Sequence, residues 1–222
     1  MFMSPSLHSE SSSNRFRSYR MGHFINLVEK ILLEKPSCTV LDVGGTHTYW
    51  RCFGGNIDWR RVRVKLLNLS KSSDLDTEEI VQVIGDACNM SEFADNSFDL
   101  VHSNSVIEHV GLWPQMEAMA SEIQRVSSAY FVQTPSFWFP IEAHARFPFF
   151  HFLPEPIRVS LVMRHKLGFW HRAENVGDAT RTVQSAVLLH KRQMAHLFPD
   201  AEIVTEKAIG LTKSYIAIKK PR

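Results

Sequence analysis

The chain has 222 residues, which is long enough for one well-buried domain with an insertion and too short for two large domains. Hydrophobic residues make up 44% and charged residues 22%, as in ordinary globular proteins. The formal net charge of +2 argues against a nucleic-acid-binding domain, because such domains usually carry a strong basic excess.

The three cysteines, Cys38, Cys52 and Cys88, have neither a paired nor a metal-ligand spacing, which favours a reduced, intracellular chain. No apolar run approaches the length that spans a membrane, and the N-terminus is polar rather than signal-like. We therefore expect a cytoplasmic protein without a transmembrane segment.

Residues 1–14 are rich in serine and have little to bury, so we expect a disordered tail there. Within residues 15–35, apolar side chains recur at three- and four-residue steps, which predicts an amphipathic helix that Pro36 ends. We expect residues 15–222 to form a single domain.

Five apolar runs that end in turns or polar clusters are expected to be β-strands: 40–43, 62–69, 80–84, 98–102 and 129–133. Residues 48–53 and 105–126 are expected to be helical, and Pro114 is expected to mark either a break in the second or a fresh helix start near Trp113. Alternating strands and helices predict a parallel, doubly wound sheet whose strands all end at one edge. Five polar residues are expected at that edge: Asp42, Asn68, Asp86, Ser103 and Thr134.

Residues 136–183 interrupt this alternation with many aromatic residues and prolines. Residues 184–198 then predict an amphipathic helix, and 201–208 and 214–219 predict an antiparallel pair of strands at the sheet edge. The expected fold class is α/β: a Rossmann-like, doubly wound and mostly parallel sheet of seven strands, the last one antiparallel, with an aromatic-rich lid (136–183) after the fifth strand.

The lid segment has three interpretations. Its aromatic residues could enclose an apolar or aromatic small molecule, with basic residues near the opening for a carboxylate or phosphate. They could instead form only a small core of the lid itself. A third interpretation is docking onto a membrane surface, which aromatic residues mixed with arginine and lysine favour.

Four motifs stand in order along the chain: V-L-D-V-G-G-T from Val40, L-L-N-L-S from Leu66, I-G-D-A from Ile84, and F-D-L-V-H-S-N-S-V-I-E-H-V from Phe98. Together they resemble class I S-adenosylmethionine-dependent methyltransferases, most closely the small-molecule branch called methyltransferase type 11. The resemblance covers about residues 40–134 and the two-strand ending.

The resemblance implies a binding site for S-adenosylmethionine at the strand ends. The glycines would approach the methionine end of the cofactor, Asn68 the ribose, Asp86 the adenine amino group, and Ser103 with Asn104 the region near the sulfonium. The implied cofactor residues are Asp42, Gly44, Gly45, Thr46, Asn68, Leu69, Asp86, Ala87, Ser103 and Asn104.

Two departures from the family pattern bear on cofactor affinity. Thr46 and Thr48 stand where the family's glycine turn has glycines, and Asn68 replaces an acidic ribose ligand. An amide oxygen still accepts one hydrogen bond but lacks the charge and two-oxygen geometry of a carboxylate. We therefore expect weaker cofactor binding than is usual in the family.

Methyl transfer needs alignment of the reactants and exclusion of water, and a hydroxyl acceptor also needs a base. His144 is our first candidate for a base or substrate contact, Glu142 could orient it, and His109 is a further catalytic candidate. Relatives with the pattern E-x-x-E-H bind a divalent metal, but Ser105 occupies the first position here, so we expect no metal. His102, within the fourth strand, is expected to be a core residue.

The predicted function is S-adenosylmethionine-dependent methylation of a small biosynthetic molecule, at oxygen or else at nitrogen or carbon. The expected acceptor is apolar or aromatic, with or without an anionic group; no nucleic-acid partner is expected, and a homodimer is left open. Two alternatives remain: a catalytically silent methyltransferase-like binding or scaffold protein, and metal-assisted methylation through Glu108, His109 and His144.

Overall fold

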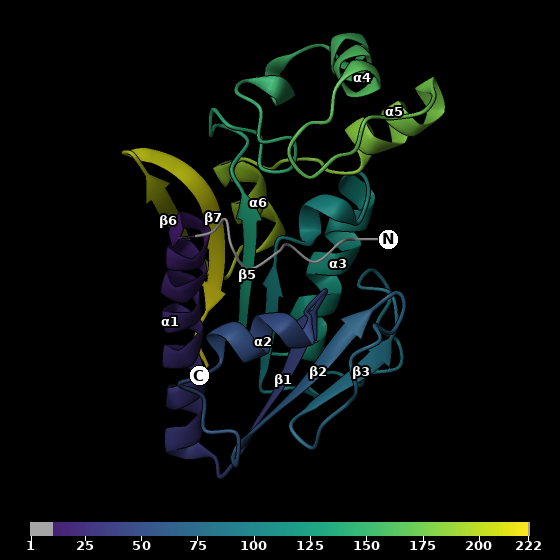
Figure 1. Ribbon diagram of the computed structural model, residues 1–222. Helices are drawn as coiled ribbons and strands as arrows, with labels where there is room; N and C mark the ends of the chain where they lie inside the picture. The colour runs from purple at the N-terminus through teal and green to yellow at the C-terminus, as the bar shows by residue number, and fades with distance from the viewer. Residues whose placement is uncertain (1–10, 222) are drawn as a thin grey trace.

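The computed structural model of the protein describes residues 11–221, with side chains from Arg15 onward. Its centre is a seven-stranded sheet in the order β3-β2-β1-β4-β5-β7-β6 (Figure 1). Residues 1–10, the larger part of the predicted tail, lie outside the described range.

The strands lie close to the predicted apolar runs. Five of them are parallel: β1 (Cys38–Val43), β2 (Val62–Asn68), β3 (Ile80–Ile84), β4 (Leu100–Asn104) and β5 (Tyr130–Pro135). The long strand β7 (Leu211–Lys219) runs antiparallel to both β5 and β6 (Glu202–Ala208). The predicted seven-stranded, mostly parallel sheet with an antiparallel last strand is therefore confirmed.

The fourth strand begins two residues later than predicted. Phe98 makes only an isolated bridge to Ser127, and the regular pairing with β1 starts at Leu100. As a result Ser103 and Asn104 are the last residues of β4 rather than residues that follow it.

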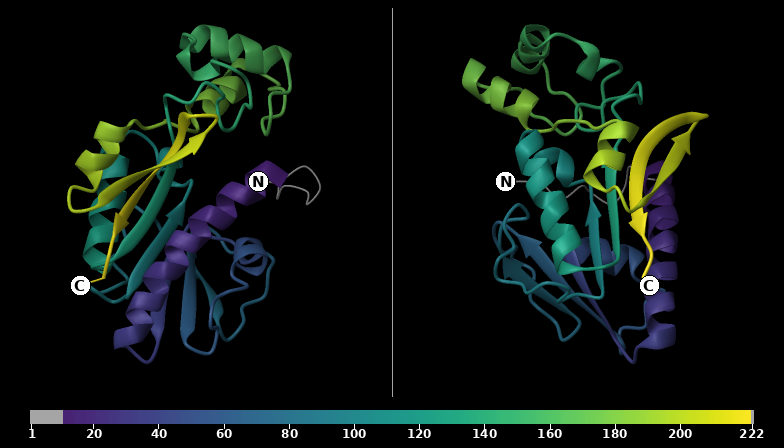
Figure 2. Two further views of the ribbon diagram at one scale, coloured as in Figure 1. Left: turned by 90° about the vertical axis from the view of Figure 1, so that its left-hand side faces the viewer. Right: turned by 180° about the vertical axis from the view of Figure 1, so that it is seen from behind.

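Helices cover both faces of the sheet. The long helix α1 (Ser11–Glu34), which starts four residues before the predicted position, packs with α2 (His47–Phe53) on one face. Helices α3 (Trp113–Val126) and α6 (Lys191–Leu197) cover the opposite face (Figure 2). The short 3-10 turn η1 (Ile107–His109) precedes α3, so the predicted helix 105–126 is interrupted.

The predicted helix 184–198 is wrong in its first half. Leu189 is fully buried and forms a bridge with Ser136, and its carbonyl accepts a hydrogen bond from the Phe137 amide. These contacts tie the chain around Leu189 to the start of the lid, and no helix forms between α5 and α6. The connections from β2 to β3 and from β3 to β4 likewise contain no helix.

The lid stands over the edge at which the parallel strands end, and we call that edge the carboxyl rim (Figure 1). It contains η2 (Phe150–Phe152), α4 (Glu155–Arg164) and α5 (Val176–Gln184). These elements share a small core of their own: Ala145, Phe150, Val162, Leu167, Ala173, Ala179 and Val183. Among the described helices, none is both long and apolar enough to cross a membrane.

Candidate active site

The sheet register brings the predicted cofactor residues to one edge. Val43 pairs with Leu67 on one side and with Ser103 on the other, so the turn after β1 lies between the ends of β2 and β4. The Gly44 amide donates to the Leu67 carbonyl at 2.8 Å, and the Gly85 amide donates to the Asn68 carbonyl at 3.0 Å. The ends of the first three strands therefore adjoin at the carboxyl rim.

Both glycines of the turn after β1 are required by its geometry. Gly44 has φ +76°, and a Cβ atom there would lie 2.4 Å from a methyl group of Val106. A Cβ atom on Gly45 would lie 1.7 Å from the Asp42 carboxylate. The turn therefore packs too closely against Val106 and Asp42 for any side chain at these two positions.

The Asp42 side chain packs against this turn at Gly45. Its side chain is buried, Oδ2 accepts a hydrogen bond from Trp50 Nε1 at 2.7 Å, and Oδ1 lies 2.7 Å from His102 Nδ1. His102 is itself a core residue, as predicted, and stacks on Phe131. Direct contact of Asp42 with the cofactor stays a prediction, and these two hydrogen bonds do not favour it.

Asn68 closes the turn from the side. Its Nδ2 donates to the Gly45 carbonyl at 2.9 Å, and in the described part of the chain Oδ1 has no hydrogen-bond partner. Thr46, where the family pattern has a glycine, caps α2 by accepting a hydrogen bond from the Tyr49 amide. The two departures from the family pattern thus have structural functions.

The other predicted cofactor residues lie along the same rim. Leu69 and Asp86 are exposed and Ala87 is half-buried; one Asp86 oxygen accepts from the Cys88 amide. At the end of β4, Ser103 Oγ and Asn104 Oδ1 are buried without a hydrogen-bond partner. Because buried polar atoms are normally paired, these two atoms are open to a ligand at this position.

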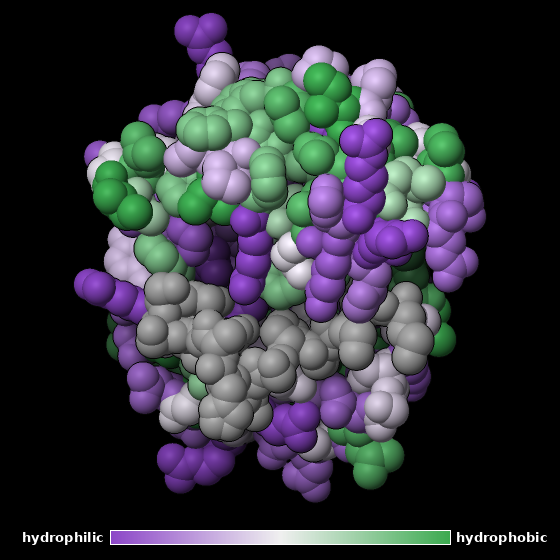
Figure 3. Space-filling view, turned by 45° about the horizontal axis from the view of Figure 1, so that its top comes forward, coloured by the Kyte–Doolittle hydropathy of each residue, from purple (hydrophilic) through white to green (hydrophobic). Residues whose placement is uncertain are grey.

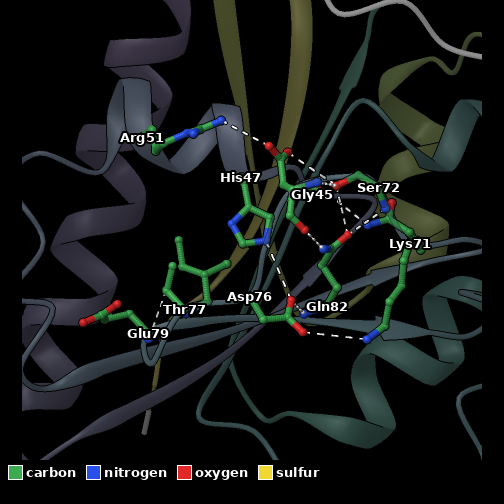
Figure 4. Close-up of polar contacts among 12 residues, drawn as sticks. Gly45, His47, Arg51, Lys71, Ser72, Asp76, Thr77, Glu79 and Gln82 are labelled. Atoms are coloured by element: carbon green, nitrogen blue, oxygen red, sulfur yellow. Dashed lines mark hydrogen bonds and ion pairs between the residues drawn. The ribbon is translucent and has the colours of Figure 1, made fainter.

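Residues 69–79 form a polar network beside the glycine turn (Figure 4). Gln82 of β3 holds this loop through Ser72 and Asp76, and Arg51 of α2 contacts Asp74 at 3.4 Å. The buried His47 lies 4.0 Å from Asp76. The network therefore holds the β2–β3 connection, which contains no helix, in place at one side of the carboxyl rim.

One rim residue was missed by the sequence analysis. Arg20 of α1 is 7% exposed, its Nη1 lies 3.4 Å from Glu206, and its Nε has no partner. Burial lowers the pKa of Arg20, while the charges of Glu206, Tyr49 and Glu108 oppose this. Arg20 could have been recognised from the sequence because it stands four residues before Phe24, on the apolar face of the helix, where a charged residue is unusual.

Glu108, His109 and His144 meet where β4 and β5 end under the lid. One ligand atom from each lies within 4.8 Å of the others. His109 Nδ1 donates to the Ser185 carbonyl at 2.7 Å, and His144 Nδ1 donates to Glu142 Oε1 at 2.7 Å, so each ring leaves Nε2 available. We call these residues, with Glu142, the Glu–His cluster.

The carboxylates of the cluster differ in environment. Glu108 is fully buried; Thr134 donates to its Oε2 at 2.9 Å, and Oε1 has no partner. Burial raises the pKa of Glu108, which the charges of His109 and His144 oppose. Burial also acts to raise the pKa of Glu142, but its hydrogen bonds to His144 and Ala145 outweigh burial and lower it.

His144 is arranged to exchange a proton. Burial acts to lower its pKa, but the hydrogen bond and charge of Glu142, helped by the charge of Glu108, raise the pKa above the usual value. Its ring stacks on Trp170, with centroids 6.2 Å apart, and meets the His109 ring edge-on. The ring is thus held in one orientation.

A cavity of about 610 Å³ adjoins the cluster within the lid. Trp170 and Ser185, which contact His144 and His109, are among its lining residues. The lining also contains two arginines, Arg172 and Arg181, and two acids, Glu174 and Asp178, and Arg181 pairs with Asp178. The cavity therefore has an aromatic wall and a lining of mixed charge.

Comparison with known proteins identifies the domain type. A family described as "Methyltransferase domain" matches residues 48–129, which include α2, the β2–β4 strands and α3. The matched part of the chain, residues 48–129, is similar to a methyltransferase domain. S-adenosylmethionine is the cofactor of this class, and the match spans the rim from α2 to the Glu108–His109 pair. No curated protein sequence matches the chain significantly.

Two solved structures share the fold of the methyltransferase domain. The CurJ carbon methyltransferase superposes with a TM-score of 0.58 at 8% identity, over 92% of this chain but only 54% of that one. The 1,6-didemethyltoxoflavin-N1-methyltransferase from Burkholderia thailandensis, solved with 1,6-didemethyltoxoflavin and S-adenosylhomocysteine, gives 0.53 at 13% identity, over 96% and 80%. At these identities the likeness establishes the fold, and this chain spans about half of the CurJ structure.

Proposed function

We propose that the protein is an S-adenosylmethionine-dependent methyltransferase that methylates a small molecule at an oxygen atom. The observation that carries this proposal is the Glu–His cluster, which lies beside the glycine turn and below the lid cavity. Val106, which covers Gly44, stands only two residues before Glu108, so the cofactor region and the cluster are neighbours.

The rim offers groups for each part of the cofactor. The glycine turn and the unpaired Ser103 and Asn104 atoms suit the methionine end. Asn68 Oδ1 is an acceptor for a ribose hydroxyl, and Asp86 has an exposed carboxylate oxygen for the adenine amino group. Bound S-adenosylmethionine supplies the methyl group as a sulfonium.

The cluster supplies the base that a hydroxyl acceptor needs. In its neutral form, His144 Nε2 would accept the hydroxyl proton as the acceptor oxygen takes the methyl group that bound S-adenosylmethionine would supply, with S-adenosylhomocysteine as the leaving group. Glu142 stabilises the resulting imidazolium through the 2.7 Å hydrogen bond to Nδ1. The proton later returns to solvent, and the lid excludes water from the reacting groups.

Replacing His144 tests this function. His144→Ala should lower turnover by about 10²–10⁴-fold, the usual contribution of a general base, and leave the affinity for S-adenosylhomocysteine unchanged. His165→Ala, an exposed lid histidine, is the matched control and should retain full turnover. Turnover is followed as S-adenosylhomocysteine release with a panel of phenols and hydroxy acids. An equal loss of cofactor affinity would place His144 in the cofactor site instead.

A second mechanism, metal-assisted methylation, is supported by the composition of the cluster. One nitrogen from each imidazole and one Glu108 oxygen, all within 4.8 Å of one another, form a mixed donor set suited to a divalent transition metal. Each imidazole is oriented through Nδ1 by a carbonyl or carboxylate, as metal-binding histidines commonly are. An ion at this position would polarise the acceptor hydroxyl directly.

The two mechanisms compete for the same atom, His144 Nε2, so chelation separates them. Full turnover after dialysis against a strong chelator supports the base mechanism. Loss of turnover that Mn²⁺ or Mg²⁺ restores supports the metal mechanism, and in that case His109→Ala should weaken Mn²⁺ binding measured by calorimetry.

A further inference from the structure

The outer surface of the lid carries a cluster of large exposed apolar side chains. Trp138, Ile141, Phe149 and Phe152 are 63%, 46%, 59% and 42% exposed. The Phe152 ring lies 6.2 Å from Trp138 and 6.3 Å from Phe149, centroid to centroid, and Ile141 bridges to Pro148 beside Phe149. These four residues form one surface, the lid patch, and Figure 3 shows hydrophobic side chains gathered over this part of the molecule.

The backbone holds the lid patch in its exposed state. Phe149 has φ +57°, a left-handed conformation that is unusual for a bulky residue, and its amide donates to the Pro140 carbonyl at 2.6 Å. The Phe152 amide donates to the Phe149 carbonyl at 3.1 Å, and His151 Nε2 donates to the Phe137 carbonyl at 2.7 Å. The neighbouring Phe150 is fully buried in the lid core. The lid thus buries one aromatic residue and turns the next ones outward.

Basic residues accompany the patch on the lid. Arg146, in the turn between Ile141 and Phe149, is exposed and lies 4.2 Å from the Phe169 ring centroid. Arg164, the last residue of α4, and Lys166, two residues after it, are exposed too, and within the described part of the chain none of the three pairs with a carboxylate. Between Ala145 and Arg172 the sequence contains five lysine or arginine residues and a single acid, Glu155. The partner of this surface should therefore be both apolar and anionic.

We propose that the lid patch docks this protein onto the surface of an anionic lipid bilayer. Trp138, Phe149 and Phe152 would enter the boundary between headgroups and acyl chains, while Arg146, Arg164 and Lys166 would contact lipid phosphates. A second copy of the chain fits less well, because a symmetric pairing would bring the two sets of basic residues together. Glu142 and His144 lie in the same loop as Ile141, so docking places the Glu–His cluster near the membrane.

The test is co-sedimentation of the full chain with lipid vesicles. The protein should bind vesicles of phosphatidylcholine and phosphatidylglycerol, bind vesicles of phosphatidylcholine alone far less, and be released as salt is raised. Trp138→Ser combined with Phe149→Ser should weaken binding by at least about tenfold, because two large apolar side chains no longer enter the lipid. Ile209→Ser, at an exposed apolar residue of the β6–β7 hairpin, is the control and should bind like the natural chain.

Quenching by brominated lipids tests insertion directly. Vesicles with bromine on the acyl chains should quench tryptophan fluorescence, and Trp138→Phe should still sediment with vesicles but lose most of that quenching. The proposal is overturned if the natural chain does not sediment with anionic vesicles, or if the double serine variant binds as well as the natural chain. It is also overturned if the double variant only abolishes a dimer, since the patch would then bind a second copy.

Discussion

The Asn68 side chain stabilises the glycine turn with one atom and leaves another atom available to a ligand. Its amide nitrogen fixes the Gly45 carbonyl at 2.9 Å, and its amide oxygen remains available. From the sequence, this residue suggested weakened cofactor binding, because the family has an acid there. In the structure an acid could not donate to the Gly45 carbonyl, so asparagine suits this particular turn.

Replacing Asn68 with the acid that is usual in the family should therefore destabilise the protein. Asn68→Asp places a carboxylate oxygen against the Gly45 carbonyl, two acceptors without a proton between them, and should cost about 1–2 kcal/mol of unfolding free energy. Cofactor affinity should stay equal or fall. Urea unfolding and calorimetry measure the two effects. Tighter binding of S-adenosylhomocysteine by the variant would show that the missing charge matters more than the turn.

Glu142 should set the pH dependence of the reaction. His144 acts as a base only when neutral, so kcat/KM should rise as pH increases through its raised pKa. Glu142→Gln removes the charge that favours the imidazolium, so the pKa of His144 should fall and the acidic limb of the profile should move to lower pH. An acidic limb that stays in place, measured from kcat/KM across the range, would rule out His144 as the titrating base.

For individual residues, the sequence pointed to candidates for the chemistry but not to how they are arranged. Glu142, His144 and Glu108–His109 could be named from their positions after strands. Their meeting depends on the path of the lid, and the anchoring of His109 depends on Ser185, which is 76 residues away. Arg20 was missed because an amphipathic helix is recognised from the spacing of its apolar residues. A single charged residue on the apolar face does not change that spacing.

Among the elements, the turn between β1 and α2 depends most on its exact residues. Gly45 packs directly on the Asp42 carboxylate, which in turn pairs with Trp50 and His102. The turn, the first helix and β4 are therefore coupled through one buried acid.

The glycines of this region offer a matched pair of substitutions. Gly45→Ala should displace Asp42, break its buried hydrogen bonds and cost about 3 kcal/mol of unfolding free energy. Gly55→Ala has no atom within 4 Å of its new Cβ and should change stability by about 0.5 kcal/mol or less. Urea unfolding followed by tryptophan fluorescence compares them. Equal stabilities of the two variants would contradict the close packing at Gly45.

The predictability of the elements follows from their surroundings. The central strands are buried on both faces, so they appear in the sequence as short apolar runs and were placed within about two residues. The helices α4 and α5 were not predicted individually, because they contribute only a few residues to a small lid core. The sequence pattern of residues 185–190 predicts a helix, but the backbone pairing of Leu189 with Ser136 at the start of the lid prevents it.

In the whole molecule, the sheet with its helices, the carboxyl rim and the lid have different roles. Two apolar cores, one on each face, stabilise the sheet. The carboxyl rim contains polar atoms without hydrogen-bond partners. The lid has a third, smaller core. The lid has a small core of its own, but several of its aromatic residues are exposed outside that core, so the interpretation that they form only a lid core does not account for them. The cavity beside the Glu–His cluster and the exposed lid patch support the other two as proposals.

Calorimetric titration with S-adenosylhomocysteine tests the central claim most directly, because it needs no acceptor. The account predicts saturable binding at one site per chain by the natural protein, retained in His144→Ala and strongly weakened in Gly45→Ala. No heat of binding up to high micromolar concentration of S-adenosylhomocysteine or S-adenosylmethionine would contradict it and would favour a methyltransferase-like scaffold without a functional cofactor site.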